Sequence, residues 1–254
     1  MQDIKKRIVI IGATSSIAEH CARAWVGEPG VELTLVARNR AKAEIIASDL
    51  RVRGPNAVIH VAEADFIDPE SINALADGLS KRGPIDTVLI AHGSLPDQAQ
   101  CQNSLRDADE ALTVNGISPV LFAEAFVKHL IANNRGTLGV IGSVAGDRGR
   151  KSNYVYGAAK GLVARYVEGL QHRVALEGSH GVKVVLIKPG PTRTPMTAHL
   201  TAQAAKMASV EDVASAIVGG MRAGKPVIYA PGKWALIMLV IRHLPRFVFN
   251  KMDI

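Results

Sequence analysis

The chain has 254 residues, a formal net charge of +7 and two cysteines. Its length suits a single α/β domain, within the size at which one hydrophobic core is still sufficient. The two cysteines, Cys21 and Cys101, exclude a disulfide framework and indicate a reducing compartment. The eight histidines have no ligand spacing such as H-E-x-x-H, so we expect no metal site.

Seven strand-like runs recur along the chain, with helical patterns between them. They cover residues 7–12, 31–37, 57–63, 86–91, 136–142, 182–188 and 226–230. This alternation predicts a doubly wound α/β fold, in which a parallel sheet carries helices on both faces. No repeat, low-complexity tract or linker interrupts the pattern, so we expect one domain over 1–232, with 233–254 as its tail. The first strand begins by Arg7 without a cleavage site after it, which predicts a cytoplasmic protein without a signal peptide.

The first predicted strand runs into a turn of small residues. A continuous apolar run from Ile8 to Ile11 is typical of a parallel strand buried on both faces. The turn residues that matter here are Gly12, Thr14, Ser15, Ser16 and Ile17. Small side chains let their backbone amides approach a diphosphate at the N-terminus of the following helix. The G-x-G-x-x-G pattern is absent, so an ordinary strand-to-helix turn is the alternative.

The end of the second predicted strand indicates which dinucleotide would bind. Sites selective for NAD place Asp or Glu at this strand end, where the carboxylate binds the ribose 2′-hydroxyl. Here Ala37 occupies that position and Arg38 follows it. A guanidinium pairs well with a 2′-phosphate, so we expect NADPH to be preferred over NADH. Arg40 and Lys42 either join the same patch or face water.

The centre of the chain carries candidate catalytic side chains. Tyr156 and Lys160 are four residues apart, which places them on one face of a predicted helix. A nearby ammonium stabilises phenolate, so we expect Lys160 to lower the pKa of Tyr156. Ser143 ends a strand-like run, where its hydroxyl can reach the same space. Asn115 is a further polar group on an apolar helix, where it either belongs to the site or bends or caps the helix.

Together these segments resemble the short-chain dehydrogenase/reductase family over nearly the whole chain. In its T-G-x-x-x-G-x-G pattern, Gly12 keeps the first glycine, while Ile11, Ser16 and Ala18 replace other positions. Ala91-His-Gly93 resembles the family's N-A-G strand end without the asparagine, and His92 has no explanation in the pattern. The matching catalytic tetrad is Asn115, Ser143, Tyr156 and Lys160.

The resemblance implies a single-domain Rossmann-type fold and a mechanism. Hydride would pass from nicotinamide to a ketone carbon while Tyr156 protonates the oxygen and Ser143 hydrogen-bonds it. Lys160 would also bind the nicotinamide ribose, and Asn115 would support a water that links Lys160 to solvent. Asp65 would contact adenine, and the segment from Pro189 to Thr194 would hold the nicotinamide end. The cofactor-binding residues implied are Gly12, Thr14, Ser15, Ser16, Ile17, Arg38, Asp65, Ala91, Gly93, Tyr156, Lys160, Pro189, Gly190, Thr192 and Thr194.

The tail is apolar and basic. Eight apolar residues run from Trp234 to Ile241, too few to span a bilayer, which needs about 20. The flanking and following cations are Lys233, Arg242, Arg246 and Lys251. This composition suits a segment in the interface of an anionic membrane, which would make the protein peripheral there. The alternative is a tail that packs on its own domain or across a subunit interface.

A narrower resemblance concerns the run from Ser143 to Tyr156 and the R-H-L-P-R-F motif in the tail. Both are similar to the decaprenylphosphoryl-2-keto-erythro-pentose reductases. These enzymes complete the 2′-epimerisation of a polyprenyl-phosphate-linked ribose to arabinose for the cell wall, after a flavin-dependent oxidase has made the ketone. The resemblance implies that Arg148, Arg150 and Lys151 receive the substrate phosphate, whereas a solvated loop is the alternative.

The expected assembly is a homodimer or homotetramer, and we expect no nucleic-acid partner. The helices near 113–134 and 156–177 carry more apolar residues than one sheet face should bury. These include Val120, Leu121, Phe122, Val163 and Val167. Family members pair the equivalent helices across a two-fold axis.

Two other functions are compatible with the sequence. A general carbonyl or 3-ketoacyl reductase would perform the same chemistry on a water-soluble substrate. A non-catalytic protein that senses dinucleotides could use the same fold, although sensing does not require a Tyr and a Lys four residues apart.

Overall fold

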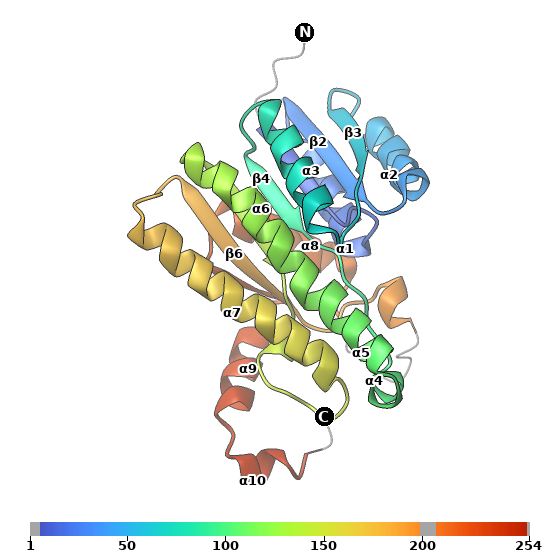
Figure 1. The fold of residues 1–254 in the computed structure, drawn as a ribbon, viewed down its shortest axis with the longest axis vertical. Coiled ribbons are helices and arrows are strands. Elements are labelled where there is room, and N and C mark those ends of the chain that lie inside the picture. Colours follow the sequence, from blue (N-terminus) through green and yellow to red (C-terminus); the bar gives the residue numbers. More distant parts are fainter. Residues whose placement is uncertain (1–5, 199–206, 253–254) are drawn as a thin grey trace.

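The computed structural model describes residues 6–198 and 207–252, and residues 253–254 of the predicted tail lie outside this range. Seven parallel strands form one sheet in the order β3-β2-β1-β4-β5-β6-β7 (Figure 1). The strands are β1 Lys6–Ile11, β2 Val31–Ala37, β3 Val58–Glu63, β4 Thr87–Ile90, β5 Gly136–Ile141, β6 Val182–Pro189 and β7 Val227–Ala230. Every predicted strand is confirmed to within one residue at each end, and so is the doubly wound α/β fold.

Helices connect the strands and cover both faces of the sheet. The α-helices are α1 Ser16–Val26, α2 Arg40–Arg53, α3 Pro69–Lys81, α4 Gln98–Asn103, α5 Leu105–Leu112, α6 Ser118–Ala132, α7 Tyr154–Leu176, α8 Val210–Arg222, α9 Lys233–His243 and α10 Arg246–Phe249. Three short turns are η1 Thr113–Ile117, of π type, and the 3₁₀ turns η2 Val144–Gly146 and η3 Pro195–Thr197. In Figure 1, α6 and α7 cross one face of the sheet, and α9 and α10 lie together at one end of the molecule.

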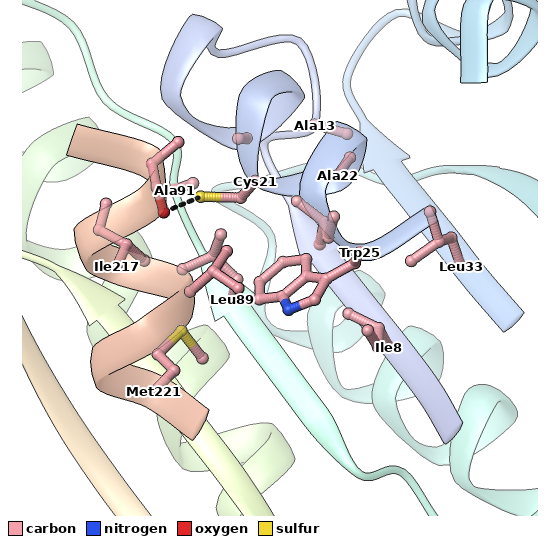
Figure 2. Close-up of a cluster of buried hydrophobic side chains, with 14 of the residues drawn as sticks. Ile8, Ala13, Cys21, Ala22, Trp25, Leu33, Leu89, Ala91, Ile217 and Met221 are labelled. Atoms are coloured by element: carbon pink, nitrogen blue, oxygen red, sulfur yellow. Dashed lines mark hydrogen bonds between the residues drawn. The ribbon is translucent and has the colours of Figure 1, made fainter. Parts of the chain in front are cut away.

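The buried strands contribute side chains to two separate hydrophobic cores, because successive side chains along a strand point to opposite faces of the sheet. On β1, Ile8 and Ile10 belong to the core under α1 and α8, whereas Val9 and Ile11 belong to the core under α3, α6 and α7. Figure 2 shows the first core, in which the Trp25 ring lies between the sheet and α8. The apolar run that predicted a strand buried on both faces is thereby confirmed.

Most of the apolar side chains that were expected to remain uncovered on α6 and α7 are buried in the fold. Phe122, Val163 and Val167 are fully buried in the second core, so the sheet face does accommodate them. This expectation was wrong because both helices pack on the sheet and on each other. The large apolar side chains that remain exposed nearby are Leu112, Ile117 and Leu162.

The helical stretch from Leu105 to Ala132 contains a π turn around Asn115, one of the predicted site residues. It is long and apolar enough to cross a membrane by length and composition, yet half of its most apolar stretch is buried inside the fold. In η1 the backbone N–H of Ser118 donates to the carbonyl of Thr113, five residues earlier, which widens the turn. The Asn115 side chain donates instead to the Ala111 carbonyl at 2.9 Å. Asn115 thus lies within this widened turn, and its side chain is bonded to the preceding turn of the helix.

The carboxyl ends of all strands meet at one edge of the sheet. The chain order reverses between β1 and β4, which opens a crevice at this edge in doubly wound folds. Gly12 follows β1 and His92 follows β4, and a Cβ atom at Gly12 would lie 2.6 Å from the Cβ of His92. Gly12 also has a φ of 79°, so only glycine fits this position without strain.

Candidate active site

The first half of the site is a cavity of about 490 Å³ at the crevice between β1 and β4. Its lining includes eight of the residues predicted to bind a dinucleotide: Gly12, Thr14, Ser15, Ser16, Ile17, Arg38, Gly93 and Thr194. Ser15 caps helix α1 without a side-chain hydrogen bond, which leaves the first amides of α1 for another acceptor. A helix N-terminus with such amides attracts a phosphate group.

Asp65 lies beside this cavity rather than in it. It lines a neighbouring cavity of about 760 Å³, which shares Arg38 and Phe66 with the first. Its carboxylate accepts a hydrogen bond from the backbone N–H of Ile67 at 2.8 Å, which holds the strand end in place. The two cavities together form a groove long enough to continue from the α1 turn past the end of β3.

Arg38 extends into the groove from the end of β2. It is exposed, and within the described part of the chain its guanidinium has no hydrogen-bond or ion-pair partner. Lys42 lines the same cavity. Arg40 instead binds the Val61 carbonyl at 3.3 Å and Glu44 at 3.4 Å. Of the two residues left open by the sequence, Lys42 therefore joins the patch and Arg40 does not.

The second half of the site is the predicted tetrad, which the fold brings together. The Lys160 ammonium donates to the Ile141 carbonyl at 3.0 Å and lies 5.8 Å from the centre of the Tyr156 ring. A Cβ atom at Gly93 would lie 2.9 Å from Asn115 Oδ1 and 3.6 Å from Lys160 Nζ. Asn115 and Lys160 thus meet over Gly93, where a larger residue would separate them. Asn115 also accepts a hydrogen bond from the backbone N–H of Ser94 at 2.9 Å.

The serine loop lies directly against helix α7. Ser143 accepts a hydrogen bond from the Ala145 backbone N–H at 3.1 Å, which begins turn η2. A Cβ atom at Gly146 would lie 2.6 Å from the backbone carbon of Lys160, so glycine permits this close contact. The approach holds the Ser143 hydroxyl next to the Tyr156 phenol, with which it forms a side-chain hydrogen bond.

Burial controls the protonation of the tetrad. It raises the pKa of Tyr156 above its ordinary value, while the hydrogen bond from Ser143 opposes this shift. The expected lowering of the Tyr156 pKa by Lys160 is therefore wrong for this structure, because the loss of solvation dominates. Burial also lowers the pKa of Lys160 to about 8. At neutral pH the phenol is protonated and Lys160 still carries most of its charge.

His92 occupies the place where the family pattern has alanine, and the structure explains it. Ser118 Oγ donates to the Phe66 carbonyl at 2.5 Å, so it must accept from His92 Nε2, which lies 2.8 Å away. The ring also packs edge-on against Phe66 and Phe122. Burial, together with the charges of Lys160 and Arg38, lowers the pKa of His92 to about 3. A neutral histidine thus ties the β4 end to helix α6 and to the loop after β3.

The segment after β6, which was predicted to hold the nicotinamide end, is covered by the tail. The Gly190 N–H donates to the Ala230 carbonyl at 3.0 Å, and Thr192 Oγ1 donates to the Gly190 carbonyl at 2.9 Å. A Cβ atom at Gly190 would lie 2.0 Å from Trp234 Nε1, so the indole lies directly on this glycine. Trp234 is therefore part of the fold at the site, which the tail composition alone did not show.

The three predicted phosphate ligands have different surroundings. Arg148 does not face the pocket: it donates to the Leu244 carbonyl at 2.7 Å and to the Ile241 carbonyl at 2.5 Å, and its guanidinium lies 3.8 Å from the centre of the Phe249 ring. The prediction that Arg148 receives a phosphate is wrong because the tail binds it. Arg150 is half-buried, its Nε has no partner, and burial lowers its pKa. Lys151 is exposed.

A buried polar cluster beside the serine loop was not predicted. Lys188, near the end of β6, pairs with Asp147 at 2.6 Å, and both side chains are less than 5% exposed. Tyr229 on β7 donates to the other oxygen of Asp147 at 2.9 Å. Lys188 follows an apolar run near the end of its strand. A cation in such a position could have predicted a buried acidic partner. The cluster fixes the loop after Ser143 to the two strands at the edge of the sheet.

With this geometry in place, comparisons with known proteins identify the family. A model described as short chain dehydrogenase matches residues 6–205. The chain belongs to this family, and it is an oxidoreductase. An uncharacterized oxidoreductase of Mycobacterium tuberculosis (strain ATCC 25618 / H37Rv) is 34% identical over 248 residues, which are 96% of each chain.

Solved structures share the fold. A short-chain dehydrogenase from Sphingobium yanoikuyae in complex with NADPH has a TM-score of 0.79 at 21% identity, covering 95% of this chain and 97% of its own. A short chain dehydrogenase from Burkholderia cenocepacia J2315 in complex with NADP has a TM-score of 0.80 at 17% identity, covering 99% and 98%. The expected single-domain Rossmann-type fold is thereby confirmed.

The neutral His92 predicts an acid-sensitive fold. Below pH 6.5 the unfolded chain protonates this imidazole, whereas the folded chain does not until about pH 3, so the free energy of unfolding falls as pH decreases. The slope is about 1.4 kcal/mol per pH unit for one proton. His92→Gln keeps an N–H donor for Ser118 and does not titrate, so urea unfolding between about pH 6.5 and 5 should show a flatter dependence. Burial also lowers the pKa of His60. The free energy of unfolding therefore keeps a smaller dependence on pH in both the wild type and His92→Gln. Identical slopes would contradict the role of His92.

The buried Asp147–Lys188 pair predicts a large effect of a single substitution. Asp147→Ala leaves the Lys188 ammonium buried without a counter-charge, which should lower the free energy of unfolding by about 3–5 kcal/mol. Glu168→Ala is the matched control, because it breaks the exposed Arg165–Glu168 pair and should cost less than about 1 kcal/mol. Urea unfolding of both variants measures the difference, and equal losses would show that the buried pair is not stabilising the loop.

Proposed function

We propose that this protein reduces a ketone to a secondary alcohol with NADPH, and that the ketone is the 2-keto group of a polyprenyl-phosphate-linked pentose. The observation that carries the reductase proposal is the meeting of Ser143, Tyr156 and Lys160 beside the groove at the sheet edge. A protein that only senses dinucleotides would not require this arrangement, so the tetrad favours catalysis.

The residues at the groove fit a nicotinamide dinucleotide. Gly12 and Gly93 leave space that a Cβ atom would fill, and the first amides of α1 are available for a diphosphate. Arg38 and Lys42 would hold a 2′-phosphate, and Asp65 would lie near the adenine. The NADPH and NADP bound in the two structural relatives support the same choice here. When bound, the nicotinamide supplies the hydride.

The side chains supply the proton and hold the oxygen. Tyr156 is protonated at neutral pH because burial raises its pKa, so it can donate to the ketone oxygen as charge develops there. Ser143 hydrogen-bonds the same oxygen and stabilises that charge. Lys160, anchored on the Ile141 carbonyl, favours the phenolate left after the transfer. Asn115 holds the Gly93–Ser94 segment. It would also support a water that connects Lys160 to solvent, so that the proton lost by Tyr156 is replaced from solvent by way of Lys160.

The choice of substrate depends on the resemblance of the loop from Ser143 to Tyr156 and of the tail. Arg150 lies on that loop with Nε unpartnered, and it would receive the substrate phosphate, with the exposed Lys151 next to it in the chain. A flavin-dependent oxidase would supply the ketone in such an epimerisation. One observation favours a general carbonyl or 3-ketoacyl reductase instead: the tail occupies Arg148, one of the three expected phosphate ligands.

A homodimer or homotetramer remains part of the proposal. The exposed Ile117 and Leu162 lie within the two ranges that would pair, and Leu112 comes directly before the first of them. Burying these side chains would offset part of the cost of association.

The role of Tyr156 is tested by removing only its hydroxyl. Tyr156→Phe should lower kcat for ketone reduction by about 10²- to 10⁴-fold, because the general acid is lost, while the Kd for NADPH stays nearly the same. Tyr154→Phe, two residues earlier and exposed, is the matched control and should retain activity. More than about a tenth of wild-type turnover in Tyr156→Phe would refute the assignment.

The same assay distinguishes the two substrate classes. Wild-type kcat/KM should be higher for a polyprenyl-phosphoryl 2-keto-pentose than for small ketones or 3-ketoacyl thioesters. The reverse order would favour the general reductase, and no turnover of any ketone despite NADPH binding would favour a sensor.

The cofactor preference is tested at Arg38. Wild-type kcat/KM should favour NADPH over NADH, and Arg38→Ala should narrow this preference by roughly 10- to 150-fold through loss of a charge-assisted contact. Arg40→Ala is the control, because Arg40 binds Val61 and Glu44 and should leave the preference unchanged. Equal use of both cofactors by the wild type would show that Arg38 does not contact the phosphate.

A further inference from the structure

The C-terminal helix pair, α9 and α10, presents an unusual surface. Helix α9 buries only one narrow line of side chains: Met238 is buried, and Trp234 and Ile241 are half-buried. Leu236 and Phe247 are 68% and 72% exposed. The large apolar side chains exposed on the pair are Leu236, Ile237, Leu239, Val240, Phe247 and Val248. An apolar patch of this kind on a surface helix indicates a contact with a partner or a membrane.

The charges around this patch have one sign. Residues 233–252 contain four lysines and arginines and no Asp or Glu. Lys233, Arg242, Arg246 and Lys251 are all exposed. Apolar side chains bordered by cations match the interface of a bilayer that contains anionic lipid, because the apolar side chains enter the interface and the cations are attracted to the headgroups.

A second copy of the chain fits this surface poorly. In a two-fold interface the same patch on both copies comes together, so the cations of each copy would approach those of the other. Residues 233–252 contain no acidic side chain to pair with them, and Asp253 is the single acidic residue of the tail. Like charges brought together cost free energy, whereas anionic headgroups would neutralise them.

The helix pair is attached directly to the catalytic half of the site. Arg148, on the loop that follows Ser143, donates to the carbonyls of Ile241 and Leu244 at the C-terminal end of α9 and lies over the Phe249 ring. Trp234 lies on Gly190 in the segment after β6. A partner surface that binds α9 and α10 would therefore also orient the Ser143 loop and the Gly190 segment.

We infer that α9 and α10 form a docking surface for an anionic membrane and hold the Ser143 loop and the Gly190 segment next to the lipid. The surface would let a ketone carried on an anionic lipid reach Tyr156 without leaving the bilayer completely. This last consequence rests on the proposed reductase function, whereas docking itself does not.

The first experiment measures binding of the full-length protein to vesicles. The wild type should sediment with vesicles of phosphatidylglycerol and phosphatidylcholine, much less with phosphatidylcholine alone, and less as salt rises, since its cations act through a screened field. The variant L236Q/V240Q/F247Q should lose at least about tenfold in binding, because the exposed apolar side chains no longer enter the interface. The control V52Q/L105Q/L176Q changes three equally exposed apolar residues elsewhere and should bind like the wild type.

A second measurement identifies the face that touches lipid. Phe247→Trp should be quenched by brominated lipids in anionic vesicles, whereas Leu105→Trp should not be quenched beyond the wild-type signal. No vesicle binding by the wild type, equal binding to neutral vesicles, or equal loss in the control triple variant would overturn the inference. So would sedimentation showing that L236Q/V240Q/F247Q splits an oligomer, because a second copy would then cover the patch.

Activity separates this inference from the proposed function. The triple variant L236Q/V240Q/F247Q should reduce a short water-soluble ketone as the wild type does, and should lose activity only on a lipid-borne ketone in vesicles. A wild type that binds anionic vesicles but reduces no ketone would leave docking supported and refute the reductase. Loss of both activities in the variant would mean that these side chains stabilise the site, which would overturn the docking role.

Discussion

The buried ammonium of Lys160 is the constraint on which the site depends. A lone charge in the interior is costly, and burial lowers its pKa to about 8. The fold offsets this cost with the Ile141 carbonyl and with close backbone approach on two sides. Gly93 lets Asn115 and Lys160 meet, and Gly146 lets the serine loop lie on α7 at Lys160 itself. The π turn at Asn115 then leaves its amide side chain free to bind the Gly93–Ser94 segment. Each of these features brings polar atoms near one charge that the apolar core cannot solvate.

The two halves of the site are built by different means. The groove for the dinucleotide is made largely of backbone, in the glycine turn after β1 and the first amides of α1. Ser16 and Ala18 replace glycines of the family pattern, but their side chains are small. The backbone can therefore follow the same turn, and the groove remains open. The catalytic half is made of side chains whose positions depend on packing between distant segments.

The sequence predicted the sheet and the tetrad because both depend on local patterns. Strand limits follow from apolar runs between turn residues, and Tyr156 and Lys160 follow from helical spacing. The environment of Arg148 could not be predicted, since its partners lie more than 90 residues later in the chain. The same holds for Trp234 on Gly190. The direction of the Tyr156 pKa shift was wrong because the spacing shows a neighbouring charge but does not show how completely water is excluded.

Contacts of the tail connect two parts of the site, the Gly190 segment and the Ser143 loop. Gly190 has no space for a methyl group, because the Trp234 indole already lies there. Any side chain at 190 would displace α9 from the sheet edge, and α9 is fastened to the serine loop through Arg148. A displacement at the end of β6 would therefore be transmitted through α9 and Arg148 to the loop after β5, in addition to any effect through the direct pairing of β5 with β6. The position of the Ser143 hydroxyl is therefore set partly by α9, which lies outside the sheet that carries this serine.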